Sequence, residues 1–239
     1  MTTYTNSTTN TVDITSPWIP ASQLLGHSIR EIIVDDVIVD DVHADKMNKL
    51  FSPTEIIALL DAKRIVRDYV SMFLPLELNR EKVVIAGGCF ASVINAEPVK
   101  DYDVFILEDQ CNRDITHMMK EVHRRDSNVR VGSKDYMNNE NIEHTLFFHD
   151  NKIQYITTSF KTREELIKHF DFRHCCVSYD FATDKLYITR EVYDLIRTKT
   201  LAKNTDKMPA QWRYEKFVNE RGWKAKENIL HSAYVTWKG

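Results

Sequence analysis

The sequence predicts an α/β protein, and three features indicate this class. Val83–Ala86 and residues 104–107 are short, apolar, β-branched runs of the kind found in buried strands. Residues 52–72 form a longer stretch with helical periodicity and a clear helix start. The adjacent glycines Gly87 and Gly88 end the first apolar run, although the chain has only six glycines. This order of elements favours a small mixed sheet with flanking helices on one side.

The helix that precedes the glycine turn has a strong start signal. Ser52 can serve as its N-cap, Pro53 suits the first turn, and Glu55 completes a capping box. Apolar residues then recur through Val66, so we expect the helix to continue to about Met72.

The remaining elements are expected from apolar periodicity and from the turn residues between apolar runs. They are a short helix (89–95), a helix (112–125), a hairpin (145–149 and 153–157), a short helix (163–169), a strand (186–189), a helix (191–198), and a helix (211–221) that ends at Gly222.

Four segments are expected along the chain. Residues 1–20 are rich in Thr, Asn and Ser and predict a disordered leader. Residues 21–50 form an acidic segment with a repeated Val-Asp-Asp-Val, which favours a charged edge strand or hairpin over a cation site. Residues 51–200 form a head domain, and residues 201–239 form a basic, aromatic-rich C-terminal extension. At 239 residues and 43% hydrophobic composition, the chain can bury one good core.

Asp101 and Asp103 are the candidate catalytic and metal-binding residues. Residues two apart on a strand share a face, so both carboxylates are expected side by side. A divalent cation with oxygen ligands, Mg²⁺ or Mn²⁺, would relieve their repulsion. The backbone N–H groups at Gly87, Gly88 and Cys89 would form a small phosphate site. A phosphate site beside two carboxylates is the minimum for metal-assisted nucleotidyl transfer.

These residues also fit a family pattern. The pattern is Gly-Gly, twelve residues that end in Pro-x-Lys, and then Asp-x-Asp; the chain matches it without a gap at Gly87, Gly88, Pro98, Lys100, Asp101 and Asp103. It resembles the signature of the DNA polymerase β-like nucleotidyltransferase superfamily. It is most similar to the head domain of tRNA CCA-adding enzymes and bacterial poly(A) polymerases. The resemblance implies transfer of a nucleoside monophosphate from ATP or another nucleoside triphosphate to a hydroxyl acceptor, with an RNA 3′ end favoured.

A second segment supports the resemblance. Residues 171–180 are similar to a family stretch that follows the catalytic strands and helps to hold the nucleotide. The resemblance therefore implies nucleotide-binding roles for Asp171 and Arg173, and Lys100 and Arg173 are candidates for neutralising the triphosphate. The family's arginine pair before Asp171 is replaced here by His169 and Phe170.

The third metal carboxylate of active family members has no clear counterpart. Counting along the predicted hairpin places Gln154 at its position. An amide oxygen can bind a metal weakly but cannot accept a proton. Asp150, Glu143 and Asp171 are alternative donors. The Ile153–Ile156 strand also resembles that of nucleotidyltransferase-like proteins from large viruses and phages.

Two other functions remain open. A degenerate nucleotidyltransferase that only binds a nucleotide or RNA would account for the missing carboxylate, whereas the intact Asp-x-Asp favours an enzyme. An enzyme that modifies a protein or a small molecule would share the chemistry and differ in the acceptor.

Charge and cysteine content bear on partners and compartment. Residues 197–239 carry ten Lys or Arg and four Asp or Glu, within a chain of net charge −3. This basic, Trp-containing tail predicts single-stranded or tRNA-like RNA as a partner. The alternative is that its aromatic residues anchor a C-terminal helix in the core.

The four cysteines lack metal-type spacing, which predicts buried thiols in a reducing compartment. No membrane segment is expected, so the prediction is a cytoplasmic protein, in the host cytoplasm if viral.

Overall fold

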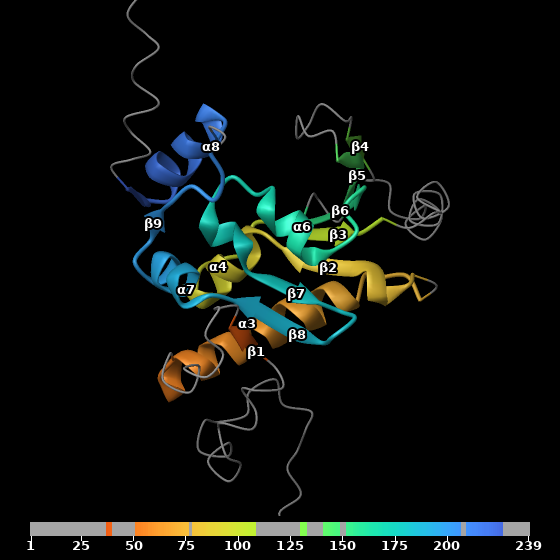
Figure 1. Cartoon of the computed structure of the whole chain (residues 1–239), viewed down its shortest axis with the longest axis horizontal. Coiled ribbons are helices and arrows are strands. Elements are labelled where there is room, and N and C mark those ends of the chain that lie inside the picture. Colours follow the sequence, from red (N-terminus) through yellow and green to blue (C-terminus); the bar gives the residue numbers. More distant parts are fainter. Residues whose placement is uncertain are drawn as a thin grey trace, which may run out of the picture.

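A computed structural model describes residues 37–39, 51–76, 78–108, 130–132, 141–148, 152–206 and 209–226. In this part of the chain an eight-stranded mixed sheet has the order β1-β8-β7-β2-β3-β6-β5-β4 (Figure 1). Its strands are β1 (Val37–Val39), β2 (Val83–Ala86), β3 (Tyr102–Ile106), β4 (Arg130–Gly132), β5 (Ile142–Phe148), β6 (Ile153–Thr158), β7 (Ser178–Asp180) and β8 (Lys185–Ile188). A separate parallel pair joins β9 (Thr200–Leu201) to β10 (Lys224–Ala225). The predicted α/β class is confirmed.

Helices flank the sheet. The α-helices are α3 (Pro53–Ser71), α4 (Gly88–Ile94), α6 (Arg163–Lys168), α7 (Arg190–Arg197) and α8 (Gln211–Glu215). Short 3₁₀ turns occur at η2 (Arg80–Lys82) and η4 (Arg173–Cys176), and α8 continues into a π-helical turn, η5 (Lys216–Glu220). No helix in the described residues is both long enough and apolar enough to cross a membrane.

Strand β2 lies at the centre of the sheet and is buried along its whole length. It pairs antiparallel with β3 on one side and with β7 on the other. Its side chains alternate between the faces, so that Val83 and Ile85 enter a larger core while Val84 and Ala86 enter a smaller one. A short strand that is apolar at every position is therefore explained by burial on both faces.

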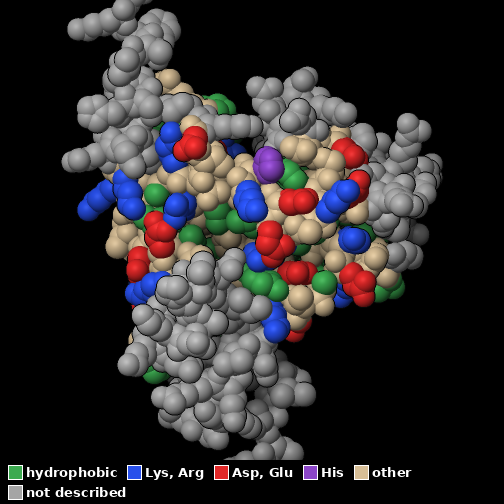
Figure 2. Space-filling model, viewed as in Figure 1, with side chains coloured by type: hydrophobic (Ala, Val, Ile, Leu, Met, Phe, Trp, Pro, Cys, Tyr) green, Lys and Arg blue, Asp and Glu red, His purple; other side chains and the backbone are tan. Residues whose placement is uncertain are grey.

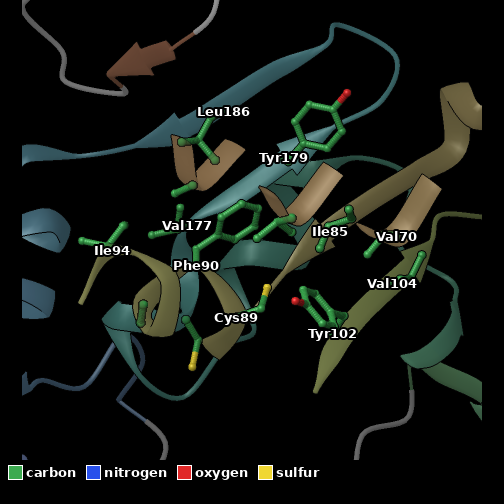
Figure 3. Packing of buried hydrophobic residues seen from close by; sticks show 14 of the residues in the cluster. Val70, Ile85, Cys89, Phe90, Ile94, Tyr102, Val104, Val177, Tyr179 and Leu186 are labelled. Carbon is green, nitrogen blue, oxygen red and sulfur yellow. The ribbon is translucent and has the colours of Figure 1, made fainter. Parts of the chain in front are cut away.

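The larger core lies between the sheet and α3, α4 and α7 (Figure 3). Phe90 of α4 is fully buried there, and Val70 of α3 and Ile196 of α7 have no exposed surface. The smaller core contains Leu166 of α6 on the other face of the sheet. The sequence predicted helices on one side only, and the short α6 corrects this detail because its apolar residues cover the second face.

Helix α3 begins as predicted. Ser52 Oγ accepts a hydrogen bond from the Glu55 N–H (3.4 Å), and Glu55 Oε2 accepts one from the Ser52 N–H (2.7 Å). The Glu55 carboxylate also forms an ion pair with Arg190 of α7 at 3.1 Å. The capping box thus connects the start of α3 to the start of α7.

Other predicted elements are found with small changes of boundary. The strand at 83–86, the glycine turn, α4, the β5–β6 hairpin, α6, β8 and α7 all occur in the predicted order. The predicted helix 211–221 is a short α-helix followed by the π-helical turn. The leader, most of the acidic segment, the helix 112–125, Asp150 and the end of the basic tail lie outside the described residues.

Candidate functional site

The candidate site lies on the face of the sheet that carries the smaller core. Register pairs Ala86 of β2 with Asp103 of β3, and Asp103 with Gln154 of β6. Residues paired in register on neighbouring strands point to the same face, so Gln154 lies directly beside Asp103. Asp101 precedes β3, and its charge acts on the Asp103 carboxyl. The structure therefore brings Asp101, Asp103 and Gln154 together.

Gly87 makes the bend that accommodates the Asp103 carboxylate. Its φ is +99°, in the left-handed region that favours glycine. A Cβ atom at Gly87 would lie 2.7 Å from Asp103 Oδ2. The backbone N–H of Gly87 donates a hydrogen bond to the Cys175 carbonyl oxygen at 3.1 Å. A Cβ atom at Gly88 would meet nothing within 4 Å. The two glycines thus differ in function: Gly87 makes room for a carboxylate, and Gly88 borders open space.

The side chain of Cys89 is buried in the larger core, so only the backbone of this residue can face the candidate site. The Cys89 thiol donates a long hydrogen bond to the Ala86 carbonyl oxygen, 3.8 Å away. Burial raises the pKa of this thiol well above its ordinary value, and the Asp103 charge adds to the rise. Cys89 is therefore not a nucleophile at this site.

Burial and a neighbouring negative charge both act on the Asp103 carboxyl. Burial, followed by the charge of Asp101, raises the pKa of Asp103 to about 7. Arg213 and Lys216 offset part of this rise. A divalent cation would offset the remainder, because it stabilises the charged form of both carboxylates.

The donor set fits a hard cation with oxygen ligands. Asp101 and Asp103 supply carboxylate oxygens, and Gln154 supplies an amide oxygen from the neighbouring strand. Gln154 is 7% exposed, so its side chain is buried. Among the described residues there is no group of three His, Cys, Asp or Glu side chains that could hold a metal. Mg²⁺ suits this set, since it keeps several water ligands when only one or two carboxylates bind it.

The alternative third carboxylates lie elsewhere or are engaged. Glu143 lies at the irregularity of β5 between Ile142, which pairs with Thr158, and His144, which pairs with Thr157, so it is remote along β6 from Gln154. Asp171 forms an ion pair with Arg213, with 2.7 Å between Asp171 Oδ2 and Arg213 Nε. Burial raises the pKa of Asp171, and Arg213 offsets only part of that effect.

Arg173 lies in a different environment from the one expected for a triphosphate ligand. Its guanidinium forms an ion pair with Glu191 of α7 and donates to the Lys203 carbonyl oxygen at 3.3 Å. This ion pair joins η4 to α7.

The C-terminal segment brings Lys216 into electrostatic range of Asp101. Lys216 lies within electrostatic range of Asp101, Lys100, Arg213 and Arg221. We call Lys100, Arg213, Lys216 and Arg221 the basic cluster. Sequence reasoning identified Lys100 and the basic character of the tail, but it did not assign Arg213 and Lys216 to the site. Their spacing of three residues, which places both on one side of a helix, was the available signal.

Aromatic packing fixes this segment against the site. The His174 ring lies 4.4 Å from the rings of Phe217 and Trp223, measured between centroids. Phe217 and Trp223 are buried in the larger core, whereas Trp212 is 58% exposed. The aromatic residues of the tail therefore serve as core anchors at two positions and leave one ring at the surface.

The fold and the site define a mixed α/β protein with two adjacent carboxylates beside a glycine bend. A profile of the Gabija anti-defense 2 family matches residues 61–199, more than half of the chain, and the chain belongs to this family. No curated protein sequence matches the chain.

Among solved structures, the chain is similar to several tRNA-processing enzymes. One is a CCA-adding enzyme in complex with CTP (TM-score 0.48, 12% identity, covering 73% of this chain and 45% of that one). Another is the Thermotoga maritima CCA-adding enzyme in complex with tRNA (TM-score 0.44, 13% identity, 77% and 42%). A third is a tRNA-processing enzyme with CTP (TM-score 0.42, 16% identity, 71% and 44%). The chain spans less than half the length of these structures.

Proposed function

We propose that this protein is a metal-dependent nucleotidyltransferase that transfers a nucleoside monophosphate from a nucleoside triphosphate to a hydroxyl acceptor. The observation that carries the proposal is the position of Asp103. Its carboxylate lies against the Gly87 bend, near Asp101, with Gln154 beside it. Carboxylates placed beside an open stretch of backbone suit a metal-bound polyphosphate.

The residues have distinct roles in this proposal. Asp101 and Asp103 would hold Mg²⁺ or Mn²⁺, with the Gln154 amide oxygen as the third protein ligand. When bound, the metal would lower the pKa of an attacking hydroxyl and stabilise charge at the phosphorus. The open space at Gly88 would let phosphate oxygens approach the backbone N–H groups of Gly88 and Cys89, and Lys100 would offset their charge.

An RNA 3′ end is the acceptor that we favour. Trp212 is exposed beside Arg213, whose guanidinium lies 5.8 Å from the Trp212 ring centroid. An exposed ring beside a cation suits an unpaired base followed by a phosphate. On the described part of the face in Figure 2, Lys and Arg are intermingled with Asp and Glu. This pattern favours a short single-stranded end over a long duplex, which would need an extended basic surface.

The family description adds a biological setting. A member of a Gabija anti-defense family that transfers nucleotides would act through a modified target, and the reaction would occur in the cytoplasm, where nucleoside triphosphates are available. A protein or small-molecule acceptor is compatible with the same site.

The second candidate is a protein that binds a nucleotide or RNA without turnover. The observation that favours it is the amide of Gln154 in place of a third carboxylate, together with the engagement of Asp171 by Arg213. Nucleotide binding without label transfer to any acceptor would select this function.

The test is label transfer. The protein is incubated with Mg²⁺ or Mn²⁺, each of the four α-labelled nucleoside triphosphates and pooled RNA, beside an Asp101→Asn/Asp103→Asn double variant. We expect transfer by the wild type and none by the double variant. Asp61→Asn, on the exposed surface of α3, is the matched control and should keep full activity. Transfer that persists in the double variant would contradict this site.

A further inference from the structure

The C-terminal segment, residues 209–226, meets the carboxylate pair with an excess of positive charge. We infer that the basic cluster binds the triphosphate of the nucleotide, so that this segment forms one wall of the site. The inference rests on the proposed function, since it assigns the residues that hold the proposed substrate.

Three contacts connect the segment to the glycine bend. Phe217 packs on His174 and lies 5.6 Å from the Phe172 ring, measured between centroids. The neighbouring Cys175 carbonyl oxygen accepts the Gly87 N–H at 3.1 Å. The ion pair between Arg213 and Asp171 joins α8 to the residue immediately before Phe172. Through these contacts the fold fixes Arg213 and Lys216 relative to the bend that faces Asp103.

The charge balance of the cluster favours an anion. Lys216 has three cations within electrostatic range, Lys100, Arg213 and Arg221, and one carboxylate, Asp101. Within the described part of the chain, neither Lys100 nor Lys216 forms an ion pair. Partial burial lowers the pKa of Lys216, and the three cations add to this effect. A polyphosphate would relieve the repulsion among these four groups and pair with each of them.

A divalent cation strengthens this argument. Once it neutralises Asp101, the attraction between that carboxylate and Lys216 is lost, and the positive charge of Lys216 is available to a phosphate. The nucleotide tail would then lie between the metal on one side and the cluster on the other. Arg173, whose guanidinium pairs with Glu191 of α7, is not part of this arrangement.

The Asp171–Arg213 ion pair has a specific role in this arrangement. It holds Arg213 at the edge of the site before the nucleotide binds, with the Arg213 side chain 30% exposed. A phosphate would compete with Asp171 for the same guanidinium. Removing the charge of Asp171 should therefore leave triphosphate affinity unchanged or increase it, whereas a purely anchoring role of Arg213 predicts a loss.

The experiment measures binding of inorganic triphosphate in the presence of Mg²⁺ by calorimetry. Inorganic triphosphate is the probe because all four nucleoside triphosphates share it. We expect Arg213→Gln and Lys216→Ala each to weaken binding about tenfold, as the loss of one charge-assisted contact predicts. Lys224→Ala, an exposed lysine of β10 in the same segment, is the matched control and should change affinity by less than about twofold. Asp171→Asn should bind as tightly as the wild type or more tightly.

Several outcomes would overturn the inference. The first is a triphosphate affinity of the Arg213→Gln/Lys216→Ala double variant that stays within about twofold of the wild-type value. The second is a loss of triphosphate affinity in Asp171→Asn that equals the loss in Arg213→Gln. The third is a wild-type protein that binds a nucleoside triphosphate but not inorganic triphosphate. Thermal unfolding checks that each variant folds; if Arg213→Gln does not, Lys216→Ala and Lys216→Glu carry the test. A wild type that binds none of the four nucleoside triphosphates would contradict the proposed function itself.

Discussion

Gly87 is the residue at which the fold and the candidate site depend on each other most directly. Its positive φ and its contact with Asp103 exclude a side chain. We expect Gly87→Ala to lower the free energy of unfolding by about 1–3 kcal/mol, because the new Cβ must displace the carboxylate or strain the backbone. Urea denaturation measures this change.

Gly88→Ala is the matched control for that prediction. Gly88 begins α4 and faces open space, so an alanine there should leave stability unchanged or raise it by up to about 1 kcal/mol. Under the proposed function the same alanine should still weaken nucleotide binding, because its methyl group occupies the space beside the backbone. Equal stability losses for both variants would show that the two glycines are not distinguished in this way.

Gln154 gives a second prediction at the scale of one residue. Gln154→Glu places a third carboxylate beside Asp103, which should lower the thermal unfolding midpoint of the metal-free protein through repulsion. The same variant should bind Mn²⁺ roughly tenfold more tightly, since ligand charge raises the affinity for a hard cation. A Mn²⁺ titration followed by electron paramagnetic resonance measures the change. An unaltered Mn²⁺ affinity in a folded variant would remove Gln154 from the site.

The sequence predicted the central residues of the site because they depend on local structure. Strand periodicity predicted Asp101 and Asp103 side by side on one strand, whereas in the structure Asp103 lies on β3 and Asp101 precedes it. The count along the sequence proposed Gln154 as the third position, and the structure puts Gln154 in register with Asp103. The assignment of Arg173 to the triphosphate is still only a prediction, and its ion pair with Glu191 makes it less favourable. The position of Arg213 depends on how α8 packs against residues distant in sequence, which periodicity does not specify.

At the scale of elements, the start of α3 depends on a short reciprocal set of hydrogen bonds. Ser52→Ala removes the side-chain acceptor of the Glu55 N–H and should cost about 1 kcal/mol of stability. Thr54 lies two residues further along and is exposed, so the unfolding free energy of Thr54→Ala should stay within about 0.5 kcal/mol of the wild-type value. Urea denaturation of both variants provides the measurement. Equal stability of Ser52→Ala and Thr54→Ala would mean that the capping box does not contribute.

Element predictions succeeded where a local signal marked both ends. The N-cap of α3, the glycines after β2 and the turn between β5 and β6 are such signals, and each element occurs in its predicted place. The sequence did not reveal that α6 covers the second face of the sheet. Six residues with two exposed glutamates carry little periodicity, and only tertiary packing shows which face Leu166 covers.

For the whole molecule, His174 predicts how stability depends on pH. Its ring is fully buried among aromatic side chains, and burial lowers its pKa to about 3, with Arg213 and Arg221 adding to the effect. The unfolded chain, with a pKa near 6.5 for this residue, binds a proton that the folded protein excludes. The contribution of His174 is therefore complete above about pH 6.5 and declines as the pH falls, by up to about 1.4 kcal/mol per pH unit.

A His174→Phe variant isolates this contribution. Asp103 acts in the opposite direction, because its raised pKa makes the folded protein retain a proton that the unfolded chain loses. The difference in unfolding free energy between wild type and variant should therefore change with pH between about 5 and 6.5, even if the pH dependence of the wild-type unfolding free energy is small because the two groups oppose each other. If the variant does not fold, the His174 ring proton shift in the wild type should stay constant over that range. A ring that titrates near its ordinary pKa would contradict the burial of His174.

The hydrogen bond from Gly87 to Cys175, and the contact of Arg213 with Asp171 beyond it, have a consequence for biosynthesis. A ribosome makes Gly87 first and adds Arg213 on the order of ten seconds later. Asp101, Asp103 and Asp171 are made within this interval, and Arg213 is the last of these charged residues to be added. The ion pair between Asp171 and Arg213 can therefore form only after the strands of the sheet have been made, so this contact joins the fold at a late step of biosynthesis.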